Sequence, residues 1–332
     1  MRRFILLILP VLIIGCVQEK EVKEIRVSYQ PGWHHVALFV IMEKGWDEII
    51  LGKRLIATSF PSGPPQMEAF SAKQHEIAYV GVAPPLSILS RGFDAKIVAV
   101  VNTEGSSLIS TPDFEFKGIE SIGGKRVMTY PPGSIQWTIL TTWLKEKGIR
   151  TELISASGAA EIREALRSRA IDLAFVPDPF PYVSLNEGYG KIIMNSSQMA
   201  PMHPCCIVLM RGDFMKNREL AVKFVALHII ASEFVMDERN KEEVMRILVK
   251  WLKIDEKIAK EFPGTTKFHT DPRDGDWLNG VENLCKAQFE LGVTRDVDGK
   301  IVKLNPDSIV DTTLYTEALK MVPKIKEKIG IQ

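Results

Sequence analysis

The sequence has few cysteines, no surplus of charge of either sign and, beyond its first residues, no long apolar run. Four cysteines in 332 residues are too few for a disulfide framework. A formal net charge of +1 offers no basic surplus to displace phosphate counterions, which excludes nucleic acid as the main partner. No stretch after the amino terminus is long and apolar enough to span a bilayer, so the remainder is predicted to be a soluble body.

Signatures of common enzyme classes are missing too. The chain contains no G-x-S-x-G, no H-E-x-x-H and no G-x-G-x-x-G after its first predicted strand. The segment 118–125 approaches a phosphate-binding loop, but Arg126 stands where serine or threonine is required. We therefore predict no catalytic residue and no cofactor.

The amino terminus predicts export. Two arginines precede an apolar run over 4–14, which has the length of a signal-peptide core and not of a membrane span. The run ends in a glycine directly before Cys16, which resembles a lipobox and implies that this cysteine carries a lipid anchor. A plain signal peptide with an incidental cysteine is the alternative. We assign 1–16 to the signal peptide and 17–24 to a charged linker.

After the linker, short β-branched runs alternate with helical stretches. This alternation predicts an α/β protein with mostly parallel sheets, and the length of the chain suggests two lobes. The predicted strands cover 25–29, 55–60, 76–80, 96–101, 126–129, 152–155, 171–176 and 206–210. Most of the runs before 180 end in glycine- or proline-containing turns that lead into helices, and the chain after 211 is mainly helical.

The turns that follow the strands are the predicted binding site. In open α/β sheets, ligands bind beyond the carboxyl ends of the strands, where helix amino termini present backbone N–H groups. One serine in each half of the chain, Ser62 and Ser134, is placed to hold an oxyanion, although plain helix capping is the alternative. The aromatic residues Trp33, Trp137, Phe180 and Tyr182 in these turns favour an organic solute, or else they pack the core. The predicted ligand-binding residues are Gly32, Trp33, His34, Ser62, Gly63, Gly81, Val82, Gly133, Ser134, Gln136 and Asp178.

Histidine and cysteine residues form two short clusters. His34 and His35 are adjacent and are expected to point apart, so a shared metal needs ligands from elsewhere. The segment 202–206 contains soft ligand types, but Cys206 enters an apolar strand, where free cysteines are often buried. We predict no metal site. A disulfide between Cys285 and one of Cys205 and Cys206 stays an open alternative.

Several of these segments resemble the binding proteins of nitrate, sulfonate and taurine importers. The first is FPSGPPQMEAF over 60–70, followed by EIAYVG over 76–81. The second is Gly133-Ser134 at a helix start, followed by DLAFVPDPF over 172–180. The resemblance covers nearly all of the mature chain. Two departures, Val176-Pro177 before Asp178 and the loop 32–35, put sulfonate specificity in doubt.

The resemblance implies a periplasmic-binding-protein-like fold of type II, with 25–105 and 205–332 in one lobe and 106–204 in the other. Hinges are expected near 102–107 and 202–206. It further implies a monomeric lipoprotein that captures a small anionic or polar organic solute and delivers it to an ABC permease and its ATPase. Proteins that bind or make a pyrimidine precursor of thiamine share this scaffold, so a binding protein or enzyme for such a heteroaromatic compound is the alternative.

Overall fold

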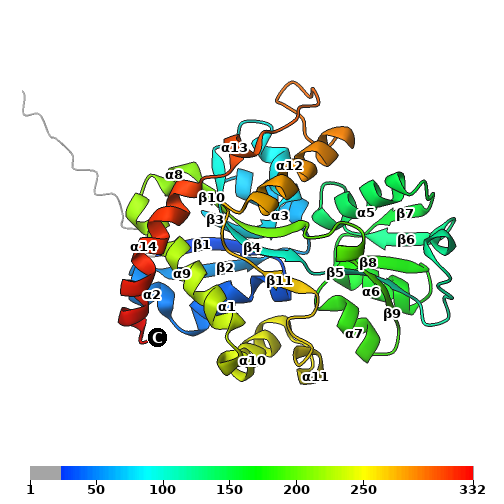
Figure 1. Ribbon diagram of the computed structural model, residues 1–332, viewed down its shortest axis with the longest axis horizontal. Coiled ribbons are helices and arrows are strands. Elements are labelled where there is room, and N and C mark those ends of the chain that lie inside the picture. Colours follow the sequence, from blue (N-terminus) through cyan, green and yellow to red (C-terminus); the bar gives the residue numbers. More distant parts are fainter. Residues whose placement is uncertain (1–23, 332) are drawn as a thin grey trace, which may run out of the picture.

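Two β-sheets with flanking helices form two lobes in the computed structural model, which describes residues 24–331 (Figure 1). The six-stranded sheet of lobe 1 has the order β11-β4-β10-β3-β1-β2, and the five-stranded sheet of lobe 2 has the order β7-β6-β8-β5-β9. The α/β class and the two-lobe architecture are therefore confirmed. The predicted signal peptide and Cys16 lie outside the described residues. Within that range no helix combines the length and the apolarity that crossing a bilayer requires.

Lobe 1 contains both ends of the described chain. Its strands are β1 (Glu24–Tyr29), β2 (Arg54–Ser59), β3 (Ile77–Gly81), β4 (Ala95–Glu104), β10 (Pro204–Arg211) and β11 (Thr266–Phe268). Its helices are η1 (Trp33–His35), α1 (Val36–Glu43), α2 (Trp46–Leu51), α3 (Gly63–Ser71), α4 (Ala83–Leu89), α8 (Gly212–Met215), α9 (Arg218–Met236), η4 (Glu238–Asn240), α10 (Lys241–Leu252), α11 (Glu256–Ala259), α12 (Gly275–Glu290), α13 (Pro306–Ile309) and α14 (Thr312–Ile329).

Lobe 2 is formed by the middle of the chain. Its strands are β5 (Ser106–Ser110), β6 (Arg126–Thr129), β7 (Glu152–Ser155), β8 (Leu173–Pro177) and β9 (Lys191–Asn195). Its helices are η2 (Ile119–Ile122), α5 (Ile135–Glu146), α6 (Ala159–Arg167), α7 (Phe180–Asn186) and η3 (Ser196–Gln198). Strands β5 and β9 were not among the predicted elements.

Strand direction explains how the lobes face each other. In lobe 1, β1 pairs with β2 and β3 in parallel, whereas β10 runs antiparallel between β3 and β4. In lobe 2, β6 pairs with β7 and β8 in parallel, whereas β5 runs antiparallel between β8 and β9. Both β5 and β10 begin directly after a crossing between lobes, at Gly105 and over 199–203. A strand that enters a sheet from its carboxyl edge must run against its neighbours, so the carboxyl edges of both sheets face the interface.

Helices α1 and α9 of lobe 1 are apolar over most of their length because they lie inside its core. Helix α1 has six consecutive buried residues, from Val36 to Ile41, because α9 and α10 pack on it beside the sheet. Helix α9 is buried along nearly its whole length between α1 and α14. Such helices are apolar on all sides, as expected for elements enclosed by protein.

A buried carboxylate links the two lobes beside the crossings. Asp178, at the end of β8 in lobe 2, accepts hydrogen bonds on Oδ2 from the backbone N–H groups of Thr265 and Thr266, at 2.8 and 3.1 Å. The hydroxyl groups of both threonines donate to the same oxygen at 3.1 Å. Gly264 makes this turn possible, since its φ is +65° and a Cβ there would lie 2.6 Å from Asp178 Oδ2. Asp178 therefore joins lobe 2 to the carboxyl-terminal part of lobe 1.

An aromatic contact lies next to this carboxylate. The ring of Trp33 in lobe 1 stacks on Tyr182 in lobe 2, with centroids 5.3 Å apart and planes 18° from parallel. Phe262 meets the edge of the same indole at 5.7 Å. Trp33 is fully buried by these neighbours. Its aromatic surface stabilises the lobe interface through packing.

The Asp178 contact leads to a pH-dependent prediction. Burial raises the pKa of the Asp178 carboxyl to about 6, although four donors favour its charged form. In the unfolded chain the pKa of the same group is about 3.9. Between these values the folded protein binds a proton that the unfolded chain lacks, so the contribution of Asp178 to stability falls as pH rises through about 6.

Unfolding by denaturant at pH 4, 5, 6 and 7 tests this effect. We expect Asp178→Asn, which keeps the shape and an acceptor oxygen, to lose less stability than the wild type as the pH rises across this range. Asp178→Ala removes the acceptor of buried donors and should cost about 1–3 kcal/mol at pH 5. Parallel stability curves for the wild type and Asp178→Asn would refute the assignment.

Candidate functional site

A cavity of about 270 Å³ lies between the two carboxyl edges. Its walls come from the turns after β1 and β2 in lobe 1, from the turns after β6, β7 and β8 in lobe 2, and from β10. The lining residues are Gln30, Pro31, His34, Pro61, Tyr130, Ile135, Gln136, Ser157, Gly158, Ala159, Ala160, Glu161, Pro177, Phe180 and Cys206. Pro61 lies directly against Gly158, since a Cβ on that glycine would stand 3.0 Å from Pro61 Cβ. The two lobes therefore touch beside the cavity.

Two of the predicted ligand-binding residues line this cavity, His34 and Gln136. Burial lowers the pKa of His34 to about 4, so its imidazole is neutral at physiological pH. Gln136 belongs to the first turn of α5, and its Nε2 donates to Ser106 Oγ at 3.2 Å. Both side chains offer neutral hydrogen-bonding groups.

The two serines predicted to hold an oxyanion lie outside the cavity wall. Ser134 is the N-cap of α5, and its Oγ accepts the N–H of Trp137 at 3.2 Å. It has the capping role that the sequence analysis gave as the alternative. The hydroxyl of Ser62 at the start of α3 is buried and has no hydrogen-bond partner within 24–331. Its ligand role stays a prediction.

The remaining predicted positions pack against other parts of the protein. A Cβ on Gly32 would meet the ring of His34, one on Gly63 would meet Pro84, and one on Gly81 would meet Ile135. The N–H of Val82 donates to Cys205 O at 2.8 Å, and Gly133 lies next to Val293. Trp33 and Asp178 belong to the lobe contacts described above. None of these predicted positions is part of the cavity lining, and their ligand roles stay predictions.

The larger part of the lobe 2 wall, Tyr130 and the segment 157–161, was not among the predicted ligand-binding residues. Glu161 accepts hydrogen bonds from both the N–H and the hydroxyl of Ser157, each at 2.8 Å, and these bonds lower the pKa of its carboxyl. The carboxylate thus lies in the first turn of α6, whose N-cap, Gly158, has no side-chain hydrogen bond. Of the described residues that line the cavity, none is lysine or arginine.

The positions of Tyr130 and Ser157 shortly after predicted strands could have identified them as candidate cavity residues. The strands over 126–129 and 152–155 were predicted at their observed bounds, and the rule that ligands bind beyond strand ends applies to Tyr130 and Ser157 as it does to Ser62. Tyr130 lies in the same turn as Gly133 and Ser134, and the turn after 152–155 contains Ser157-Gly158, the same pair as Ser62-Gly63.

Three buried side chains that were not predicted to lie together meet at the cavity. His34, His35 and Cys206 each present one potential ligand atom, and these atoms lie within 4.8 Å of one another. Cys205, Cys206 and Cys285 are all free thiols. The Sγ atoms of Cys205 and Cys206 are 3.7 Å apart, and Cys285 is buried in α12.

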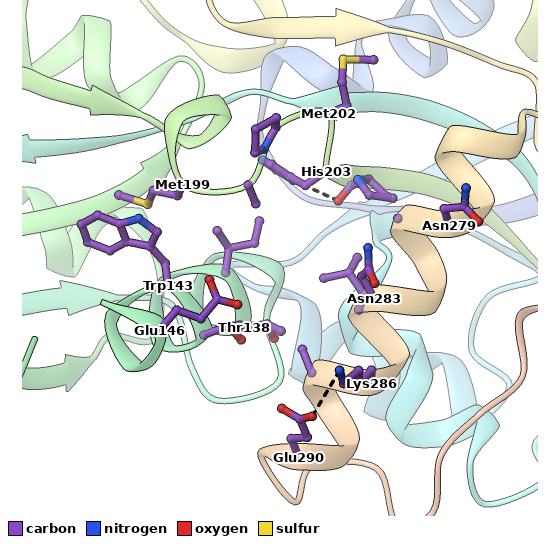
Figure 2. A pocket seen from close by; sticks show the side chains of 18 of the residues that line it. Thr138, Trp143, Glu146, Met199, Met202, His203, Asn279, Asn283, Lys286 and Glu290 are labelled. Atoms are coloured by element: carbon purple, nitrogen blue, oxygen red, sulfur yellow. Dashed lines mark hydrogen bonds and ion pairs between the residues drawn. The ribbon is translucent and has the colours of Figure 1, made fainter. Parts of the chain in front are cut away.

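A larger groove of about 630 Å³ lies between α5, the crossing segment 199–204 and α12 (Figure 2). In Figure 2, Glu146 of α5 lies opposite Asn283 and Lys286 of α12, whereas the indole of Trp143 extends towards Met199. Lys286 and Glu290 form an ion pair at 3.9 Å within α12. None of the strand-end turns and none of the predicted ligand residues line this groove, so we place the solute site in the smaller cavity.

Solved structures with the same fold are binding proteins. The periplasmic nitrate-binding protein of Synechocystis has 16% identity and a TM-score of 0.78, over 93% of this chain and 91% of that one. The periplasmic aliphatic sulphonate-binding protein of Escherichia coli has 15% identity and a TM-score of 0.72, over 87% and 92%. A ligand-binding component of an ABC-type import system from Staphylococcus aureus, solved with zinc bound, has 18% identity and a TM-score of 0.74, over 89% and 99%.

At these identities the likeness concerns the fold, and the ligand does not follow from it. No curated protein sequence is significantly similar to the chain. A family model does match, and it covers residues 18–249, from the predicted linker through lobe 2 and into α10. That span includes every strand-end turn that lines the cavity. By this match the chain belongs to the NMT1-like family.

Proposed function

We propose that this protein is the solute-binding component of an ABC-type importer, a monomer that passes its solute to a permease and an ATPase. The observation that carries the proposal is the cavity between the lobes, which strand-end turns of both sheets enclose. A protein of the same fold from S. aureus is described as the ligand-binding component of an ABC-type import system. Those from Synechocystis and E. coli are described as periplasmic binding proteins. Binding in such a cavity, without chemical conversion, fits a chain in which no catalytic motif was found.

The chemistry of the wall supports a small polar organic solute. Tyr130, Ile135 and Phe180 supply apolar surface, which a bare inorganic anion does not need. Gln136 and the neutral His34 supply hydrogen-bonding groups, and the volume of about 270 Å³ is below that of most drug-sized sites. Glu161 contributes the charge of the wall, so a zwitterion such as taurine or a neutral heteroaromatic ring fits this lining better than nitrate does.

Capture requires the lobes to separate and close again. The backbone crosses between them at Gly105 and over 199–203, while Pro61 and Gly158 touch beside the cavity. We propose that rotation about the two crossings parts Pro61 from Gly158 and admits the solute. Solute contacts with both walls then favour the closed arrangement.

A thermal-stability screen tests the proposal with four solute classes: alkanesulfonates including taurine, nitrate, bicarbonate and pyrimidines. The matching solute binds only the folded protein and should raise the free energy of unfolding by about 2.7 kcal/mol at 100 times its Kd. We expect taurine or a pyrimidine to stabilise more than nitrate does. No stabilisation by any class would contradict the proposal, and conversion of a solute to product would favour an enzyme instead.

Gln136→Leu tests the cavity wall with the solute identified in that screen. Leucine is similar in size to glutamine but lacks its buried hydrogen-bonding amide, so binding should weaken by about 1–3 kcal/mol in calorimetric titration. The matched control is Gln74→Leu, because Gln74 is exposed in lobe 1 outside the cavity. Equal affinities of the two variants would remove Gln136 from the site.

We also propose that Cys16 anchors the protein to the membrane through a lipid. Expressed with its own leader, the wild type should fractionate with membranes, and Cys16→Ser should move it to the soluble fraction. The control Cys285→Ser, at a thiol within α12, should leave the protein in the membrane fraction. Membrane association of Cys16→Ser would contradict the lipid anchor, and a wild type in the soluble fraction would leave only a plain signal peptide.

A further inference from the structure

Three buried side chains with metal-ligand chemistry converge at the cavity between the lobes. His34 and His35 come from the turn after β1, and Cys206 comes from β10. They are 3%, 0% and 2% exposed, and their potential ligand atoms lie within 4.8 Å of one another. His34 and Cys206 line the cavity, and His35 lies behind them.

The hydrogen bonding of the two imidazoles leaves nitrogen atoms free. His35 Nδ1 lies 2.7 Å from the carbonyl oxygen of Gln30, a distance at which it donates its hydrogen. His35 Nε2 then carries a lone pair, and this buried atom has no partner among the described residues. A backbone carbonyl that holds the opposite ring nitrogen is the usual support of a metal-ligating histidine. His34 Nδ1 is likewise buried without a partner in the described chain.

One buried histidine of lobe 1 has a hydrogen-bond partner for each of its ring nitrogens. His228 in α9 is fully buried, and its Nδ1 lies 3.0 Å from the hydroxyl of Tyr79. Its Nε2 lies 2.8 Å from the carbonyl oxygen of Val100. Both of its nitrogens are satisfied, as buried polar groups generally are. Within 24–331, His75, His203 and His269 also have an unpaired buried ring nitrogen. The distinguishing feature of His34 and His35 is that their potential ligand atoms converge with that of Cys206.

We propose that His34, His35 and Cys206 bind a borderline or soft metal cation, Zn²⁺ or Cu⁺, at the wall of the cavity. Two imidazole nitrogens and one sulfur are the donors that these ions prefer, and the absence of a carboxylate from the three argues against Ca²⁺ and Mg²⁺. The three donor atoms already lie within 4.8 Å of one another, and coordination at about 2.0–2.3 Å from one ion requires them to move closer together. On binding, the Cys206 thiol releases its proton to solvent and coordinates as thiolate.

Three protein ligands leave a coordination position open on a tetrahedral ion. Because His34 and Cys206 line the cavity, that position faces the space assigned to the solute. Bound Zn²⁺ with one thiolate would also leave one positive charge, which the described lining side chains lack, whereas Cu⁺ with the thiolate would be neutral. This last step rests on the proposed function, whereas the metal site itself does not.

Equilibrium dialysis of the full chain, stripped of metal and kept reduced without oxygen, tests the site with Zn²⁺ or Cu⁺ and no added solute. One equivalent of Zn²⁺ or Cu⁺ should bind. Cys206→Ser and His35→Gln should each weaken binding by more than about 100-fold, beyond the 10–100-fold effect of changing a supporting group. Cys285→Ser is the matched control, because this thiol is also buried but lies outside the cluster, and its affinity should equal that of the wild type.

Substitution with Co²⁺ keeps the test decisive should Cys206→Ser fail to fold. The wild-type protein and Cys285→Ser should show an intense near-ultraviolet thiolate-to-cobalt band, and His35→Gln should lose it at the same Co²⁺ concentration. Failure of both Zn²⁺ and Cu⁺ to bind the wild type, a cobalt spectrum without the sulfur band, or unchanged affinity in folded Cys206→Ser would overturn the proposal. A solute screen that fails while one equivalent of metal binds would reject the proposed function alone.

Discussion

The architecture depends on the constraint that a strand entering a sheet from its carboxyl edge must run against its neighbours. The chain leaves lobe 1 at the carboxyl end of β4 and returns through β10, so β5 and β10 are reversed in their sheets. This reversal turns the carboxyl edges of the two sheets towards each other. Every turn that lines the cavity follows from that arrangement, as does the position of Asp178 at the end of β8 beside the crossings.

The chemistry of the cavity follows from burial. Burial keeps His34 neutral, and the Ser157 donors keep Glu161 ionised, so the wall lacks a cationic side chain in the part of the chain that the structure describes. Glu161 places a negative charge in the first turn of α6, which makes this helix start less favourable for an anion. A solute therefore meets amide, imidazole and aromatic groups first, unless a cation occupies the His34, His35 and Cys206 site.

The sequence predicted the fold better than the site, for physical reasons. Strands such as 126–129 and 152–155 are marked by local β-branched runs and turns, which need no tertiary information. Strand β5 was missed because its serines suggest a loop, although every one of its residues is buried. Ser134 illustrates the harder case, since whether a hydroxyl caps a helix or faces a solute depends on its orientation. His35 and Cys206 are 171 positions apart in the chain, and they come together because β10 pairs with β3.

The strand order places the contacts between the lobes at two different distances from the crossings. Pro204 is in register with Thr103, and Thr266 is in register with Glu104, so both crossings and the Asp178 contact lie in one row at the edge formed by β11, β4 and β10. The Pro61–Gly158 contact follows β2 and β7, the strands at the opposite edges of the two sheets. With strands about 4.8 Å apart, β2 lies roughly 14 Å from β10. A rotation about the row of crossings would therefore move the Pro61–Gly158 contact at the far edge more than it would move the Asp178 contact.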